Sequence, residues 1–153
     1  MEKLDFFDLN SPADLYRIIH EVYSEYVKNP TEKDFFFLVL GFTHLREWIS
    51  DSGYKEMVKK HGKGMPLSDS EEFFLKMYEL DSFKTIQALC NRGKHHITRD
   101  IKNQTSKLNG LRAGLGRVGD SLNQTYFLID GVDSRDYFIE LLNKYNHWFS
   151  KHG

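Results

Sequence analysis

The residues best suited to take part in a chemical reaction form a polar run from Asn91 to His96, which reads Asn-Arg-Gly-Lys-His-His. An imidazole near neutral pKa can accept and return a proton. A guanidinium or ammonium beside it can hold a phosphate and stabilise developing negative charge. Such a set could cleave RNA without a metal. The same cations could instead end a helix by binding its last carbonyl groups and favouring its dipole.

Positive charge continues beyond this run. From Arg92 to Arg117 there are seven Lys or Arg against one acid, Asp100, a local balance of +6 in a chain whose net charge is −1. Such asymmetry favours contact with phosphates or with an acidic partner, and its alternative is a solvated polar loop. We expect a surface that binds nucleic acid or a protein partner, formed by one amide and six cations: Asn91, Lys94, Arg99, Lys102, Lys107, Arg112 and Arg117.

Composition places these residues on one folded domain covering residues 1–153. The chain is 40% apolar, with twelve Phe, eight Tyr and two Trp, enough for a substantial core. Its longest apolar run, Phe35 to Phe42, is far short of the roughly 20 residues that span a bilayer, so no membrane contact is expected. The first residues mix acids with apolar side chains and lack a signal-peptide pattern, and a single cysteine, Cys90, forms no internal disulfide. A cytoplasmic protein is expected.

The positioning elements are mainly helices. Apolar residues at spacings of three and four, together with capping residues, predict helices over about 12–28, 30–49, 54–60 and 68–80, from 81 or 82 towards 95, and from 133 or 134 to 151. Residues 125–129 have strand composition, and residues 97–118 should supply the partner strand, with Leu111, Ala113, Leu115 and Val118 as alternating candidates. We therefore expect a mainly α fold, a four- to five-helix bundle with a small β hairpin-like insertion before the C-terminal helix.

Other constellations have simpler explanations. Cys90, His95, His96 and His44 could ligate zinc, but no paired ligand motif is present, so neither a metal nor a cofactor is expected. The glycines from Gly114 to Gly119 match a dinucleotide fingerprint, yet a strand-like segment follows where a helix is needed.

A polar group near Trp48 and the aromatic residues could each form a further surface. His44, Arg46 and Glu47 would either face the end of the helix that begins near residue 81 or form a solvent-facing patch beside Trp48. Most aromatic residues occur at helical spacing and belong to the core. The conceivable stacking groups for bases are Tyr54, Tyr126 and Tyr137.

Three motifs together resemble the HEPN-type helical bundles found among bacterial and phage accessory proteins. They are HLREWI from His44, LCNRGKHH from Leu89, and YFLIDGVDSRDYFIELLNKYNHWF from Tyr126. Catalytic members of that family carry an arginine, usually followed by a polar residue such as asparagine, and a histidine four to six residues beyond. Asn91 matches the polar residue, but Cys90 stands where the arginine belongs.

The resemblance therefore implies a non-catalytic HEPN-like module that binds nucleic acid or a protein partner through the segment from Asn91 to Arg117. The alternative is a metal-independent ribonuclease that uses His95 or His96 with Arg92 or Lys94. A homodimer is one arrangement that would complete such a site.

Overall fold

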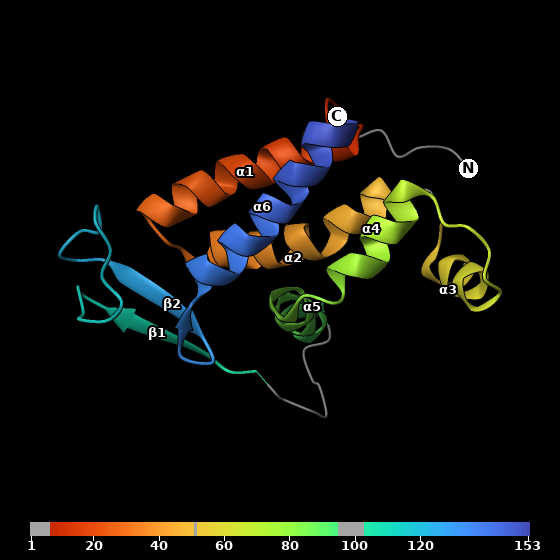
Figure 1. The fold of residues 1–153 in the computed structure, drawn as a ribbon. Coiled ribbons are helices and arrows are strands. Elements are labelled where there is room, and N and C mark those ends of the chain that lie inside the picture. Colours follow the sequence, from red (N-terminus) through yellow and green to blue (C-terminus); the bar gives the residue numbers. More distant parts are fainter. Residues whose placement is uncertain (1–6, 51, 95–102) are drawn as a thin grey trace.

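The computed structural model describes residues 7–50, 52–94 and 103–153, and of Lys94 it describes only the backbone. Within these ranges the fold is mainly α, with a small antiparallel sheet before the C-terminal helix, as predicted (Figure 1). The elements are α1 (Pro12–Lys28), α2 (Glu32–Ile49), α3 (Tyr54–Gly62), α4 (Asp69–Met77), α5 (Asp81–Lys94), β1 (Thr105–Asn109), β2 (Thr125–Ile129), β3 (Val132–Asp133) and α6 (Ser134–His152). No helix in the described ranges combines the length and the apolar character needed to cross a membrane.

Local capping signals set where the helices begin. Ser11 before α1 and Ser68 before α4 each form a capping box with the acid three residues later. Asp133 accepts a hydrogen bond from the backbone N–H of Arg135 (2.9 Å) at the start of α6. These side chains satisfy backbone donors that the first helical turn leaves without partners. The predicted starts of these three helices are confirmed.

The core is built around α2, which packs against α1, α4, α5 and α6. Figure 1 shows α6 crossing α2 with α1 alongside. Phe42 on α2 stacks with Phe138 and Tyr145 of α6, with ring centroids 5.6 and 6.2 Å apart. Gly41 lets α1 approach closely, because a Cβ at that position would lie 2.9 Å from Cγ1 of Ile19. The middle of α2 is therefore held from several sides.

The sheet has the order β1-β2-β3, and Phe127 of β2 packs against Tyr26 and Phe35. The partner strand does come from residues 97–118, but its expected residues are wrong. Leu111 and Val118 lie in the loop after β1 and are exposed (47% and 108%).

The observed register follows from the turn after β2. The Asp130 carboxylate accepts hydrogen bonds from Asn103 Nδ2 (2.6 Å) and from the backbone N–H of Gln104 (2.9 Å). The backbone N–H of Asp130 in turn donates to the carbonyl of Gln104 (2.8 Å). These contacts place Thr105 opposite Ile129. These hydrogen bonds, and not an alternating apolar pattern, therefore determine which residues pair with β2.

Helix α3 stands at one end of the molecule, apart from the packed helices (Figure 1). Met57 anchors it and is fully buried. Lys60 lies 3.3 Å from the Glu71 carboxylate of α4, whose side chain is only 4% exposed. The remaining surface of α3 faces solvent.

Candidate functional site

The predicted binding segment is only partly described. Asn91 and Arg92 are exposed near the end of α5, and Nη1 of Arg92 donates to the carbonyl oxygen of Asn103 (3.1 Å). The other predicted positions in this segment, namely His95, His96, Arg99, Lys102 and the side chain of Lys94, lie outside the described residues. The structure therefore does not place the two imidazoles.

Between α5 and β2 the structure describes three cations, and two of them are paired with acids. Lys107 on β1 lies 3.6 Å from Glu32 at the start of α2. Arg117 contacts Asp136 and lies 3.6 Å from Asp133. Arg112 is exposed and makes no ion pair within the described part of the chain. The positive balance counted along the sequence is therefore partly neutralised by acids that are distant in sequence.

A buried cluster that sequence reasoning missed fixes this loop to α6. Arg135, whose side chain is 3% exposed, donates from Nη1 and Nη2 to the two carboxylate oxygens of Asp120 (2.8 and 3.1 Å) and also binds Asp133. Tyr126 donates its hydroxyl to Asp120 (3.1 Å). The hydrogen bonds from Arg135 lower the pKa of Asp120 from 3.8 to about 2. Every charged group here has a partner, so the cluster is structural.

The group on α2 divides between two environments. Arg46 is buried (5% exposed), with its guanidinium 3.9 Å from the Phe74 ring centroid and Nη1 donating to the Phe74 carbonyl (2.9 Å). The interpretation as a solvent-facing patch is therefore wrong for Arg46. His44 does face the end of α5, because its Nε2 lies 3.7 Å from Sγ of Cys90, and its Nδ1 lies 2.9 Å from Glu47.

This order of thiol, imidazole and carboxylate has the connectivity of an activated nucleophile. Cys90 is only 1% exposed, however, so a substrate cannot approach its sulfur in this structure. Reactive cysteines lie in accessible environments. Among the described residues no group of three or more Cys, His, Asp or Glu is placed to hold a metal ion.

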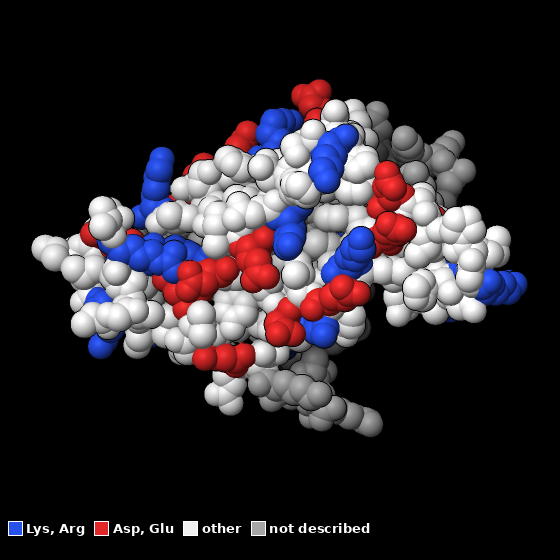
Figure 2. All heavy atoms as spheres, in the orientation of Figure 1, with Lys and Arg blue, Asp and Glu red and all other residues white. Residues whose placement is uncertain are grey.

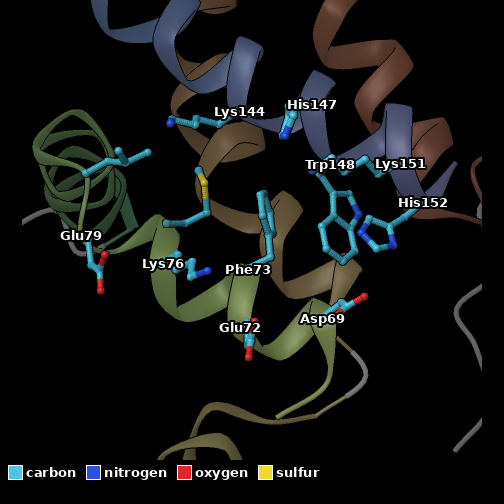
Figure 3. Close-up of a pocket in the computed structure, with 12 residues that line it drawn as sticks. Asp69, Glu72, Phe73, Lys76, Glu79, Lys144, His147, Trp148, Lys151 and His152 are labelled. Atoms are coloured by element: carbon cyan, nitrogen blue, oxygen red, sulfur yellow. The ribbon is translucent and has the colours of Figure 1, made fainter.

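A groove of about 630 Å³ lies between α4 and α6, within the size range of ligand-binding clefts (Figure 3). Its floor is apolar and comes from both helices: Phe73, Met77 and Leu80 on the α4 side and Trp148 on α6. The Phe73 ring packs against Trp148 in a tilted arrangement with 4.8 Å between ring centroids, and Trp148 stacks with His152 at 3.8 Å. The three rings form a continuous row that joins α4 to α6.

The two rims of the groove carry charges of opposite sign. The rim on the α4 side is mainly acidic and consists of Asp69, Glu72, Lys76 and Glu79. The rim on α6 carries two positive charges, from Lys144 and Lys151, together with the imidazoles of His147 and His152. None of these side chains is in an ion pair with another described residue. Blue and red side chains lie over this part of α4 and α6 in Figure 2.

Sequence reasoning assigned Phe73 and Trp148 to the core and overlooked the groove. A signal was present on each helix, because charged residues recur at spacings of three and four directly beside these aromatic residues. The sequence could not show that the two faces meet along one groove. No family model, no curated protein and no solved structure matches the chain.

Proposed function

We propose that the protein is a binding module that holds an amphipathic helix of a partner protein in the groove between α4 and α6. The observation that carries this proposal is the pair of rims, opposite in charge and unpaired, on either side of an aromatic floor. A fitting partner has an apolar stripe with acidic residues on one flank and basic residues on the other. The acidic flank would face α6 and the basic flank would face α4.

The dimensions of the groove support a helical occupant. The rim on the α4 side begins at Asp69, and α4 extends about 12 Å to Met77, shortly before Glu79; the rim on α6 runs from Lys144 to His152, also about 12 Å. That length accommodates two to three turns of a bound helix. A small molecule would fill the floor without reaching both rims along this length. The repeated charges therefore favour an extended, two-sided ligand.

Trp148 should contribute most to binding. Aromatic residues in the centre of an interface carry a large share of its energy, and truncation of such a residue commonly costs about 2 kcal/mol or more, roughly thirtyfold in affinity. Trp148 lies on the floor between Phe73 and His152. The chain has only one other tryptophan, Trp48. Trp148 fluorescence in a Trp48→Phe background therefore reports on the groove directly.

The test uses three synthetic stapled helices of about 14 residues, which share one apolar stripe and differ in their flanks. One has an acidic and a basic flank, the second has two acidic flanks and the third has two basic flanks. Wild-type protein should bind the mixed peptide most tightly. The double variant Lys144→Glu with Lys151→Glu makes both rims acidic, so its preference should change to the peptide with two basic flanks.

A matched control is Lys28→Glu with Lys33→Glu, which makes the same change in net charge on exposed positions outside the groove. This control should keep the wild-type preference. The proposal is wrong if the three peptides bind equally, or if the control changes the preference as much as the groove variant does. It is also wrong if only small aromatic compounds, and no peptide, change Trp148 fluorescence.

A second candidate is the segment from Asn91 to Arg117, which we propose as a surface for nucleic acid or another protein in a HEPN-like module. The exposed side chains of Asn91, Arg92 and Arg112 support it. Charge reversal at Arg99, Lys102 and Lys107 should weaken binding of labelled RNA at low salt or of a partner. If neither interaction changes, this candidate fails.

As an alternative, we propose a metal-independent ribonuclease in which His95 or His96 transfers protons and Arg92 or Lys94 binds a phosphate. RNA cleavage in the presence of a chelator would support it. Cleavage that persists in a variant combining His95→Ala with His96→Ala would remove it, because no imidazole of the pair would remain.

A further inference from the structure

A row of lysines on α3 is independent of the groove. Lys55 and Lys59 are four residues apart and share a face of α3, and Lys63 follows after four more residues. All three are exposed, and none is in an ion pair with a described residue. Lys60 is different, because it binds Glu71. Figure 2 shows lysine side chains projecting from the end of the molecule where α3 lies.

Two exposed tyrosines accompany these lysines, one at the start of α3 and one at the end of α4. Tyr54 is 61% exposed and begins α3, with its ring centroid 6.2 Å from that of Phe74. Tyr78 is 51% exposed and lies one turn beyond Phe74 on the same side of the chain. Nζ of Lys84 lies 5.6 Å from the Tyr78 ring centroid. The Arg46 guanidinium, 3.9 Å from the Phe74 ring centroid and 6.0 Å from that of Tyr78, lies between the surroundings of the two tyrosines.

We propose that this surface binds single-stranded nucleic acid. Lys55, Lys59 and Lys63 would contact successive phosphates, and bases would stack on Tyr54 and Tyr78. Three acids, Glu56, Glu79 and Asp81, lie in the same segments. Four lysines without an acidic partner among the described residues, Lys55, Lys59, Lys63 and Lys84, leave a surplus of one positive charge. Stacking on tyrosine is tolerant of base identity, so the surface should bind without strong sequence preference.

The same lysines could attract an anionic membrane, but the apolar residues fit that occupant poorly. An interfacial helix needs a broad apolar face turned outward. In α3 the best-placed apolar residue, Met57, is fully buried towards the bundle. Tyr54 and Val58 are the exposed apolar side chains of this nine-residue helix. Flat aromatic rings beside a row of cations match a nucleic-acid strand better.

The test measures binding of a fluorescent oligo-uridine strand to the whole protein by anisotropy at several salt concentrations. Each lysine that contacts a phosphate adds about −0.7 to the slope of log K against log salt concentration. Lys55→Ala with Lys59→Ala should therefore make the slope shallower by about 1.4 and weaken binding. Tyr54→Ala should weaken binding by at least about fivefold and leave the slope unchanged, while Tyr54→Phe retains affinity.

The control double variant Lys28→Ala with Lys33→Ala should keep both affinity and slope, because these exposed lysines lie outside the surface. The inference is overturned if the Lys55 and Lys59 variant binds like wild type. It is equally overturned if the wild type binds anionic phosphatidylserine vesicles but not the oligonucleotide. If oligonucleotide binding is lost only on charge reversal at Lys102 and Lys107, the inference is also overturned, because the binding surface is then the segment after α5.

Discussion

Replacement of Asp120 by asparagine tests the buried cluster that attaches the loop of residues 110–124 to α6. Asp120 accepts two hydrogen bonds from Arg135, one from the Tyr126 hydroxyl and one from the backbone N–H of Arg117 (2.9 Å). Its side chain is 6% exposed. Asparagine keeps the shape of the side chain but turns one accepting oxygen into a donor. The NH₂ group of the asparagine then faces N–H and O–H donors and cannot accept their hydrogen bonds.

The cost has two parts. The pKa shift of Asp120, from 3.8 to about 2, corresponds to at most about 2.5 kcal/mol of stabilisation, and screening by water leaves about 1–2 kcal/mol. A mismatched donor in a partly buried site costs about 1–3 kcal/mol more. We therefore expect Asp120→Asn to lower the free energy of unfolding by about 2–5 kcal/mol at pH 7.

The effect should depend on pH in a defined direction. Because the folded-state pKa of Asp120 is below its unfolded value, the charge contribution is complete well above pH 4. It is lost as pH falls from about 4 through 2, and at pH 3 about half of it should remain. The difference between wild type and Asp120→Asn should therefore become smaller at pH 3, because asparagine does not titrate.

Urea unfolding followed by circular dichroism at pH 7 and pH 3 measures both quantities. Asp8→Asn is the matched control, because Asp8 is exposed and its replacement should change stability by less than about 0.5 kcal/mol. Our reasoning is refuted if Asp120→Asn unfolds like the control at pH 7. It is also refuted if its deficit is the same at both pH values.

Three further changes have defined outcomes. Gly41→Ala should lower the melting temperature by differential scanning calorimetry and destabilise by about 1–3 kcal/mol, because its Cβ would meet Ile19, whereas an unchanged temperature would mean that α1 shifts freely. Tyr145→Phe should cost about 1–2 kcal/mol in urea unfolding, since the buried hydroxyl donates to the Phe42 carbonyl (2.7 Å). Cys90 should react with a thiol reagent on the order of a hundredfold more slowly in native protein than in urea, and fast native reaction would contradict its burial.

Helix positions could be predicted because their signals are local. Ser11, Ser68 and Asp133 each act on backbone N–H groups two or three residues away, so the pattern can be recognised without knowledge of the fold. The periodic apolar stripes on α1 and α6 likewise identify the faces that become buried. The mainly α fold class follows from such signals.

Strand pairing was less accessible because it depends on distant contacts. The alternating pattern that begins at Leu111 suggested an edge strand, yet Thr105 to Asn109 pairs with β2 although most of its side chains are exposed. Asp130 decides this register by binding the backbone of Gln104, twenty-six residues earlier in the chain. No window short enough to show periodicity contains both residues.

The charge available at the candidate sites could not be predicted from the sequence either, because it depends on ion pairs between distant residues. Lys107 meets Glu32 and Arg117 meets Asp136, so a count along the sequence overstates the positive charge that these residues offer to a ligand. The lysines of α3 do not stand out in the sequence, because two acids near them, Glu56 and the buried Glu71, make the local charge look more balanced. Only the fold shows that Glu71 is already occupied by Lys60.

The physical difference between a structural charge and one available for binding is therefore its partner within the chain. The rims on α4 and α6 attract each other electrostatically, yet the Phe73 and Trp148 rings fill the space between the helices, and no rim side chain reaches an opposite charge among the described residues. Each rim keeps its hydration in the free protein. A helix with complementary flanks could satisfy both rims at once while it covers the aromatic floor, and that combination of unmet charge and accessible apolar surface favours binding over further closure of the fold.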